Sequence, residues 1–204
     1  PARRYLAARG LGELVERGDL PADLRLHPRC PYWIAGPDGR PQRIAEPPAL
    51  VALVRSPAGE PVGLHATWLC SNGSGKARLT GPDGTALDAR KLRAIHPGAT
   101  RGGAIRLYPP AGRIAVGEGL ETVLAVRVAD PALPVWSAIH AGGVAAAVLP
   151  ADVRDALAIA DADPAGARAV LALAKRLRAE GRRVRVLVPP VGADAADVLT
   201  AEVP

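Results

Sequence analysis

Three acidic residues follow two short apolar runs in the second half of the chain. Glu118 comes just after the run Arg113–Val116, and Asp161 and Asp163 come just after Ala156–Ala160. In extended backbone, residues two apart point to the same side, so Asp161 and Asp163 can present two carboxylates together. Carboxylate oxygens are preferred ligands of Mg²⁺, which offsets the charge on a phosphate group during its transfer. The sequence therefore predicts a site for Mg²⁺ or Mn²⁺ that acts on phosphoryl groups.

A second interpretation of the Asp-x-Asp pair is a solvated turn in which one carboxylate caps the next helix. Pro164 suits the first turn of such a helix, and Gly166 allows close approach of the backbone. The presence of Glu118 after another apolar run favours the metal site, because the carboxyl ends of parallel strands meet at one edge of a sheet.

From Gly112 onward, short apolar runs alternate with segments of helical periodicity. The expected strands are Arg113–Val116, Val135–Ala138, Ala156–Ala160 and Val184–Val188. The expected helices are Leu120–Val128, a short segment near 142–149, Pro164–Glu180 and Ala195–Leu199. This alternation predicts an α/β fold with a central parallel sheet of about four strands, covered on both faces.

The first half of the chain is basic and has a different pattern. Residues 1–112 hold 16 Lys and Arg against 9 Asp and Glu, whereas residues 113–204 hold 10 against 11. An amphipathic helix over residues 3–17, interrupted by Gly10 and Gly12, precedes an irregular proline-rich stretch to Pro48. The expected strands are Ala49–Val54 and Pro61–Leu69, which form a hairpin, then Lys76–Leu79 and Ile105–Leu107. We expect a small, basic, mostly antiparallel α+β lobe over residues 1–111 and a catalytic domain over residues 112–204.

Basic residues concentrate between Ala89 and Leu107, a run without any acidic residue. The candidate nucleic-acid-binding residues are Lys76, Arg78, Arg90, Lys91, Arg93, Arg101 and Arg106. Such side chains neutralise backbone phosphates, although a solvated basic loop is the alternative. The segment Ser71–Lys76 is not a phosphate loop, since Cys70 and Ala77 stand where that motif needs Gly and Ser or Thr, and a turn is expected there.

Other features exclude several classes of protein. Cys30 and Cys70 lack the spacing of a zinc ribbon or a disulfide framework, and the four histidines lack metal-ligand spacing. The tryptophans are too few and scattered to predict a base-stacking platform. No apolar run approaches the roughly 18 residues of a membrane span, and the N-terminus lacks a signal-peptide core, so we expect a cytoplasmic protein with no membrane partner. The sequence begins at Pro1 and contains no methionine, which suggests a piece of a longer protein.

The second half resembles the Toprim domain, which is shared by bacterial-type primases, topoisomerases and certain nucleases. The resemblance rests on the motifs Glu118–Thr122 and Asp161–Gly166 and on the tail that follows Pro189. It covers residues 112–204, and it is strongest to primase-like Toprim proteins of phages and mobile elements. Residues 53–69 and 91–107 resemble more loosely the basic region that precedes Toprim in those proteins. The resemblance implies a Toprim-like Rossmannoid fold.

The resemblance also implies a role for each matched residue. Glu118 becomes a metal ligand or a general acid/base, and Asp161 and Asp163 become metal ligands. Asp194 and Asp197 in the tail are further candidate metal ligands. The alternatives are that they support other ligands or that Asp194 caps a helix. The supporting residues are Gly117, Gly119, Glu121, Gly142, Gly143 and Gly166; for Glu121 the alternative is simple complementation of a helix dipole.

The function implied by the resemblance is a primase-like nucleotidyltransferase. It would synthesise primers on a single-stranded DNA template from nucleoside triphosphates, with a zinc-binding domain or a helicase as further parts of the parent protein. One alternative is a Toprim nuclease, which would activate water with the same carboxylates. Another is a non-catalytic nucleic-acid-binding or docking module of a larger replication protein. A topoisomerase is less favoured, because Tyr5, Tyr32 and Tyr108 lie in no recognisable setting for a nucleophile.

Overall fold

The computed structural model describes residues 1–189 of the 204-residue chain. Two compact units are built from alternating stretches of sequence. The first consists of Pro1–Leu20, Leu24–Ala52 and Leu64–Arg93, and the second of Pro21–Asp23, Leu53–Gly63 and Ala94–Pro204. The predicted boundary after residue 111 stays a prediction, but the second compact unit begins earlier and includes the tip of a hairpin from the first half.

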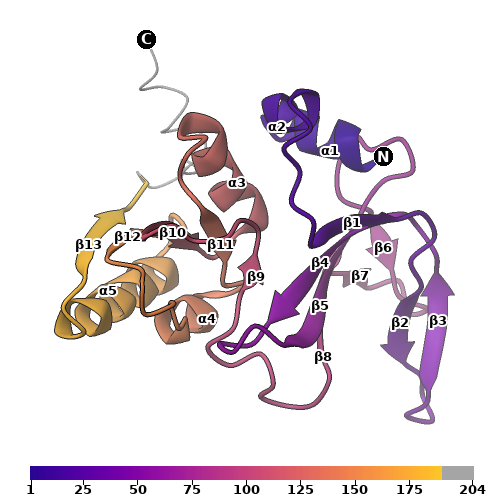
Figure 1. Cartoon of the computed structure of the whole chain (residues 1–204). Helices are drawn as coiled ribbons and strands as arrows, with labels where there is room; N and C mark the ends of the chain where they lie inside the picture. The colour runs from indigo at the N-terminus through magenta and orange to yellow at the C-terminus, as the bar shows by residue number, and fades with distance from the viewer. Residues whose placement is uncertain (190–204) are drawn as a thin grey trace. The chain divides into compact units, whose positions relative to one another are not determined.

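The first unit begins with two short helices and continues as β-structure (Figure 1). The helices are α1 (Ala2–Ala8) and α2 (Gly12–Glu16). A four-stranded sheet, in the order β1-β4-β5-β8, contains β1 (Leu24–His27), β4 (Ala49–Arg55), β5 (Pro61–Trp68) and β8 (Arg90–Ala94). Two antiparallel pairs complete it: β2 (Tyr32–Ala35) with β3 (Pro41–Ala45), and β6 (Leu79–Thr80) with β7 (Ala86–Leu87). The ends of β4 and β5 that face their connecting turn belong to the second unit.

Local chemistry explains where α1 ends. Gly10 has a φ of 75°, a conformation that costs glycine little and other residues more. Its N–H donates to the carbonyl of Ala7 at 3.0 Å, and the N–H of Leu11 donates to the carbonyl of Leu6 at 2.9 Å. This is the Schellman pattern, which satisfies the last carbonyls of a helix. The predicted interruption of the first helix is confirmed.

Aromatic packing holds the core of the first unit. The rings of Tyr32 and Trp68 meet edge to face with centroids 4.6 Å apart, and each residue is 1% exposed. The Tyr32 hydroxyl donates to the carbonyl of Asp88 at 2.8 Å, and the Trp68 indole N–H donates to the carbonyl of Cys30 at 2.9 Å. The polar atoms of both rings are therefore satisfied inside the core, as buried Tyr and Trp require.

The second unit is a five-stranded sheet with helices on both faces. Its order is β13-β12-β10-β11-β9, from β9 (Ile105–Arg106), β10 (Arg113–Gly117), β11 (Val135–Ser137), β12 (Asp155–Ile159) and β13 (Arg183–Leu187). The last four strands pair in parallel, whereas β9 pairs antiparallel with β11. The helix α3 (Leu120–Ala129) covers one face, and α4 (Ala141–Ala146) and α5 (Pro164–Ala179) cover the other (Figure 1). The predicted α/β fold with about four parallel strands is confirmed.

Two expectations about the first half need correction. The stretch before Pro48 is not irregular, since it contains β1, β2 and β3. The strands β1 and β3 lack the apolar run by which a strand is recognised, and β2 is an apolar run of only four residues within a proline-rich stretch. The strand expected at Lys76–Leu79 is reduced to a single bridge between Leu69 and Lys76, and β6 begins only at Leu79. The predicted helix at Ala195–Leu199 lies outside the described residues.

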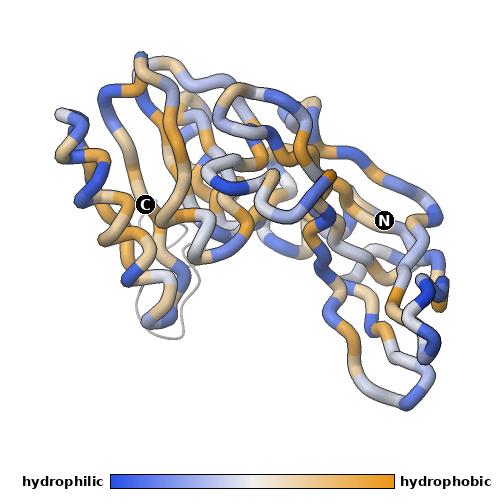
Figure 2. Tube along the Cα trace, turned by 90° about the horizontal axis from the view of Figure 1, so that it is seen from below, coloured by the Kyte–Doolittle hydropathy of each residue, from blue (hydrophilic) through white to orange (hydrophobic). Residues whose placement is uncertain are grey.

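The helix α5 buries one face of the sheet with an apolar stripe. Its apolar and charged residues alternate with helical spacing, which can be followed as orange and blue bands in Figure 2. The residues that it buries are Gly166, Ala169, Val170, Leu173, Ala174 and Leu177. Four of them, Ala169, Val170, Leu173 and Leu177, share a core cluster with Ala156 and Ala158 of β12, so one stripe of the helix closes one face of the sheet. None of the described helices is both long and apolar enough to cross a membrane.

Two leucines of α5 test this packing as a matched pair. Leu173 is 0% exposed and Leu171 is 60% exposed. We expect Leu173→Ala to lower the free energy of unfolding by about 2–5 kcal/mol, because it leaves a cavity in the core. Leu171→Ala should change it by less than about 0.5 kcal/mol. Urea denaturation measures both, and equal losses would contradict the described orientation of α5.

Candidate functional site

The parallel strands of the second unit end at one edge of the sheet. In its register, Gly117 of β10 lies beside Ser137 of β11 and beside Ile159 of β12. Glu118 therefore leaves the sheet next to β12, from which Asp161 departs two residues after Ile159. Both acidic residues are half-buried. The sheet thus brings the backbone of Glu118 and of the Asp-x-Asp segment to neighbouring strand ends.

The end of β11 holds the backbone of Glu118. The hydroxyl of Ser137, a residue 1% exposed, donates to the carbonyl oxygen of Glu118 at 2.7 Å. The N–H of Ile139 donates to the same oxygen at 3.1 Å, and the N–H of Ala138 donates to the carbonyl of Gly117 at 2.8 Å. Three hydrogen bonds therefore hold the backbone at the point where Glu118 leaves the end of β10. The sequence patterns did not single out Ser137, although a serine inside an apolar strand is a signal of this kind.

The turn that follows β11 is strained. Ile139 has a φ of 75°, and the left-handed region costs a β-branched residue about 1–2 kcal/mol. The next residue, His140, begins α4, where its Nδ1 accepts from the N–H of Gly143 at 3.0 Å. A Cβ atom on Gly143 would collide with the carbonyl of Ala138. The predicted need for glycine at 143 is therefore a need for close backbone packing, and the strained residue lies directly beside Glu118 in the hydrogen-bond pattern.

Asp163 begins α5. Its Oδ1 accepts from the N–H of Gly166 at 2.7 Å, so this carboxylate caps the helix. A Cβ atom on Gly166 would lie 2.8 Å from the carbonyl oxygen of Asp161, which requires glycine for a close approach. Asp163 is exposed, whereas Asp161 is half-buried. The cap interpretation is therefore confirmed for Asp163, and its role as a metal ligand stays a prediction.

The glycines around Glu118 permit tight packing of α3 against the sheet. A Cβ atom on Gly117 would lie 3.0 Å from Val123 of α3, and one on Gly119 would lie 2.8 Å from the hydroxyl of Thr122. A Cβ atom on Gly142 would lie 3.3 Å from Nδ1 of His140. Among the predicted supporting residues, Glu121 is half-buried in the first turn of α3.

Comparison with known families accounts for both halves of the chain. A family model described as Domain of unknown function (DUF7146) matches residues 1–107, and one described as Toprim domain matches residues 113–204. The chain belongs to the DUF7146 family and carries a Toprim domain. The resemblance of the second half to Toprim is confirmed. No curated protein matches the sequence.

Solved primase structures share the fold of this DUF7146 protein. A DNA primase domain from Pseudomonas aeruginosa has 18% identity and a TM-score of 0.59, covering 97% of this chain and 66% of its own. A DnaG primase catalytic domain bound to single-stranded DNA has 17% identity and a TM-score of 0.62, covering 100% and 70%. The primase fragment of the bacteriophage T7 primase-helicase has 20% identity and a TM-score of 0.54, covering 96% and 67%. The chain spans about two thirds of these proteins, and at such identities the likeness establishes the fold alone.

The predicted ligand set of the Toprim domain suits a hard cation, because carboxylate oxygens are what Mg²⁺ and Mn²⁺ prefer. Within residues 1–189, no three Asp, Glu, His or Cys side chains come together closely enough to hold a metal ion. Asp194 and Asp197, two of the five predicted ligands, lie outside the described residues. The described candidates are therefore Glu118 and Asp161 on neighbouring strand ends, together with Asp163.

The predicted nucleic-acid-binding residues of the DUF7146 protein fall into two groups. Lys91 and Arg106 are partly buried and bonded within the fold. The ammonium of Lys91 donates to the carbonyl of Trp33 at 2.7 Å and lies 3.8 Å from the centroid of the Tyr32 ring. Arg106 donates to the carbonyls of Ser56 and Pro57, both at 2.7 Å. Burial lowers the pKa of both side chains.

The remaining members of the predicted set have exposed side chains. They are Lys76, Arg78, Arg90, Arg93 and Arg101. A phosphate contact needs an exposed side chain. These five side chains are more exposed than those of Lys91 and Arg106, and their binding of nucleic acid stays a prediction.

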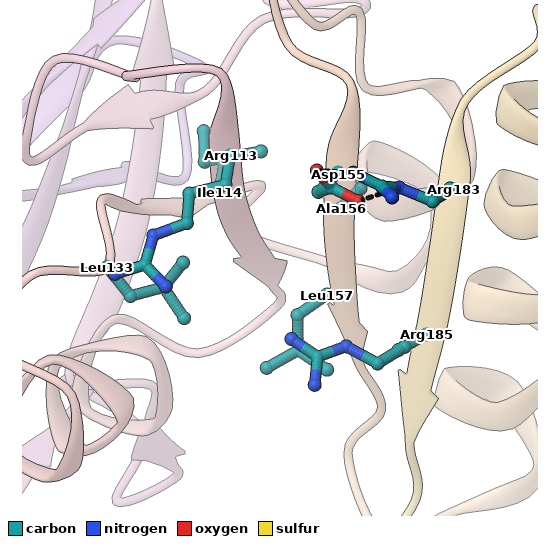
Figure 3. Close-up of a pocket in the computed structure, with 8 residues that line it drawn as sticks. All are labelled: Arg113, Ile114, Leu133, Asp155, Ala156, Leu157, Arg183 and Arg185. Carbon is teal, nitrogen blue, oxygen red and sulfur yellow. Dashed lines mark hydrogen bonds and ion pairs between the residues drawn. The ribbon is translucent and has the colours of Figure 1, made fainter.

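A pocket of about 360 Å³ opens at the opposite edge of the Toprim sheet (Figure 3). Arg113, Asp155 and Arg183 line it, and they are the first residues of β10, β12 and β13. Asp155 and Arg183 form a two-pronged ion pair of 2.6 and 2.8 Å, which holds the pKa of Asp155 below its usual value. The pocket lies at the amino ends of the strands, away from Glu118 and Asp161, and it is not part of the candidate site.

The two roles of Asp163 can be separated by a pair of substitutions. Asparagine also caps helices well, whereas alanine does not. We expect Asp163→Ala to lower the free energy of unfolding by about 1 kcal/mol, and Asp163→Asn to lower it much less. Thermal or urea denaturation measures the difference. If both variants were equally destabilised, the carboxylate charge rather than the cap would be what stabilises α5.

Proposed function

We propose that this Toprim protein is the catalytic core of a primase-like nucleotidyltransferase that synthesises primers on single-stranded DNA. The observation that carries this proposal is the extent of the structural likeness. The three primase structures cover 96–100% of this chain, so the basic first half matches as well as the Toprim domain. A Toprim nuclease would need only the second half to resemble such proteins.

The proposed chemistry places the carboxylates at the reacting phosphate. The 3′-hydroxyl oxygen of the growing strand attacks the α-phosphorus of a nucleoside triphosphate, the bond to the bridging oxygen breaks, and pyrophosphate leaves. Glu118, with its backbone held by Ser137, accepts the hydroxyl proton or positions that hydroxyl. Where Glu118 is instead a metal ligand, it and Asp161, together with Asp163, Asp194 or Asp197, would hold a Mg²⁺ or Mn²⁺ ion that offsets the charge on the phosphate. The exposed basic residues of the first half would hold the template.

The second candidate function is a Toprim nuclease. It is favoured by the same carboxylates, because they could activate water in place of a 3′-hydroxyl. A third candidate is a module that binds nucleic acid without catalysis. Incubation with single-stranded DNA, labelled nucleoside triphosphates and Mg²⁺ or Mn²⁺ separates the three, since they give strand synthesis, cleavage or neither.

Substitutions at the carboxyl edge test the proposed site. Glu118→Gln and Asp161→Asn should each lower the rate of primer synthesis at least about 100-fold, because they remove a charge that contacts the reacting groups. Their melting temperatures should stay near that of the parent. The matched control is Asp152→Asn, an exposed acid near the amino end of β12. Full activity of either edge variant would remove that residue from the site, and a large loss of melting temperature would make its role structural.

Metal binding should be visible without any activity. Glu118 and Asp161 bring negative charge to neighbouring strand ends, and a bound cation would offset that charge. Mg²⁺ at about ten times its Kd should add about 1.4 kcal/mol and raise the melting temperature by roughly 3–6 °C, at millimolar concentrations. The rise should disappear in the double variant Glu118→Gln/Asp161→Asn, and it should not be reproduced by KCl of equal ionic strength. A rise that persists in the double variant would place the metal elsewhere.

A further inference from the structure

A shallow groove of about 400 Å³ lies within the first unit. None of the candidate metal ligands lines it. Trp33, Ile34, Gly39 and Pro41 line it from the β2–β3 hairpin, and Lys91 and Arg93 line it from β8. No acidic residue is among its lining residues. The groove therefore combines an aromatic residue with two cations and no acidic side chain in its lining.

Trp33 differs from the other two tryptophans in its exposure. Trp68 and Trp136 are each 1% exposed, whereas Trp33 is 37% exposed. On β2, Tyr32 and Ile34 pack against the core cluster of the first unit, so the residue between them lies on the outer face of the hairpin. About a third of the Trp33 surface is therefore open to a partner, and tryptophan is a residue that is enriched at binding interfaces.

The two cations of the groove have different roles. The ammonium of Lys91 donates to the backbone carbonyl of Trp33 and lies over the Tyr32 ring, so it ties β8 to the hairpin. Arg93, two residues along the same strand, is exposed. A guanidinium in this position can bind two oxygens of one phosphate.

We propose that this groove binds single-stranded nucleic acid, with an unpaired base against the indole of Trp33 and a backbone phosphate on Arg93. The occupant follows from charge complementarity, since residues 1–112 carry 16 basic against 9 acidic residues and the groove adds no acid of its own. Base stacking on an aromatic ring next to a cation is a recurring way to hold a single strand without reading its sequence. The inference uses the nucleic-acid partner of the proposed function but does not require catalysis.

Tryptophan fluorescence tests the groove directly, because Trp33 is the exposed tryptophan. Titration with oligothymidylate should quench the emission of the parent protein. Trp33→Leu should abolish the quenching and weaken binding, measured by anisotropy of a labelled oligonucleotide, by roughly 5- to 150-fold. Trp33→Tyr should restore most of the affinity, since it keeps an aromatic face. The matched control is Leu64→Ala, another exposed apolar residue of the same unit, which should bind like the parent.

The phosphate contact has its own measurement. Arg93→Ala should lower the slope of log K against log salt by about 0.7, the contribution of one single-strand phosphate. Arg3→Ala, an exposed arginine outside the groove, should leave the slope unchanged. Unchanged affinity and quenching in Trp33→Leu would overturn the proposal. Quenching by an acidic leucine-containing peptide, but not by oligothymidylate, would also overturn it and assign the groove to a protein partner.

The outcomes also distinguish this inference from the proposed function. If the parent protein makes no primers yet binds oligothymidylate through Trp33, the primase proposal fails and the groove stands. If it makes primers and Trp33→Leu binds the template as tightly as the parent, the groove proposal fails and the primase proposal stands.

Discussion

The parallel pairing of β10 with β12 is the constraint on which the candidate site depends. In this register Gly117 lies beside Ile159, so the residues that follow each strand emerge at the same level. An antiparallel pairing would have sent the Asp-x-Asp segment to the other end of the sheet. The apolar strands, buried by α3 on one face and by α4 and α5 on the other, stabilise this pairing. The position of Glu118 relative to Asp161 is therefore a product of core packing.

At this edge of the sheet, one residue has a structural role and also a predicted role in chemistry. Asp163 caps α5, the helix that closes one face of the sheet, and it is also a candidate metal ligand. The hydroxyl of Ser137 donates to the carbonyl of Glu118, and Ile139 has an unfavourable backbone conformation in the next turn. A sequence selected for stability alone would avoid a β-branched residue in the left-handed conformation of Ile139. Strain beside an acidic residue is what a preorganised site is expected to contain.

Sequence patterns were informative wherever an apolar run was long enough to be buried. All four parallel strands, α3, α5 and the edge that carries the acids follow from runs of four or more residues with few interruptions. The short strands β1 and β3 could not be found in this way, because most of their side chains are polar or exposed, and the four apolar residues of β2 lie in a proline-rich stretch. The roles of Lys91 and Arg106 were also beyond prediction, since a count of charges does not reveal that a backbone carbonyl lies 2.7 Å from each. The three tryptophans are scattered in the sequence, and only the structure distinguishes Trp33 from the others, by its exposure.

The interleaving of the two compact units has a consequence for how the protein melts and how it can be divided. The turn between β4 and β5 belongs to the second unit, where Arg55 and Ala104 exchange two backbone hydrogen bonds of 2.9 and 3.0 Å. Arg106 adds two more to the same turn. Two strands of the first unit therefore cannot unravel without removing hydrogen bonds from the second. A cut between the two family matches would separate the second unit from Pro21–Asp23 and Leu53–Gly63, which belong to it. A fragment that begins at the Toprim match would therefore lack part of its own fold.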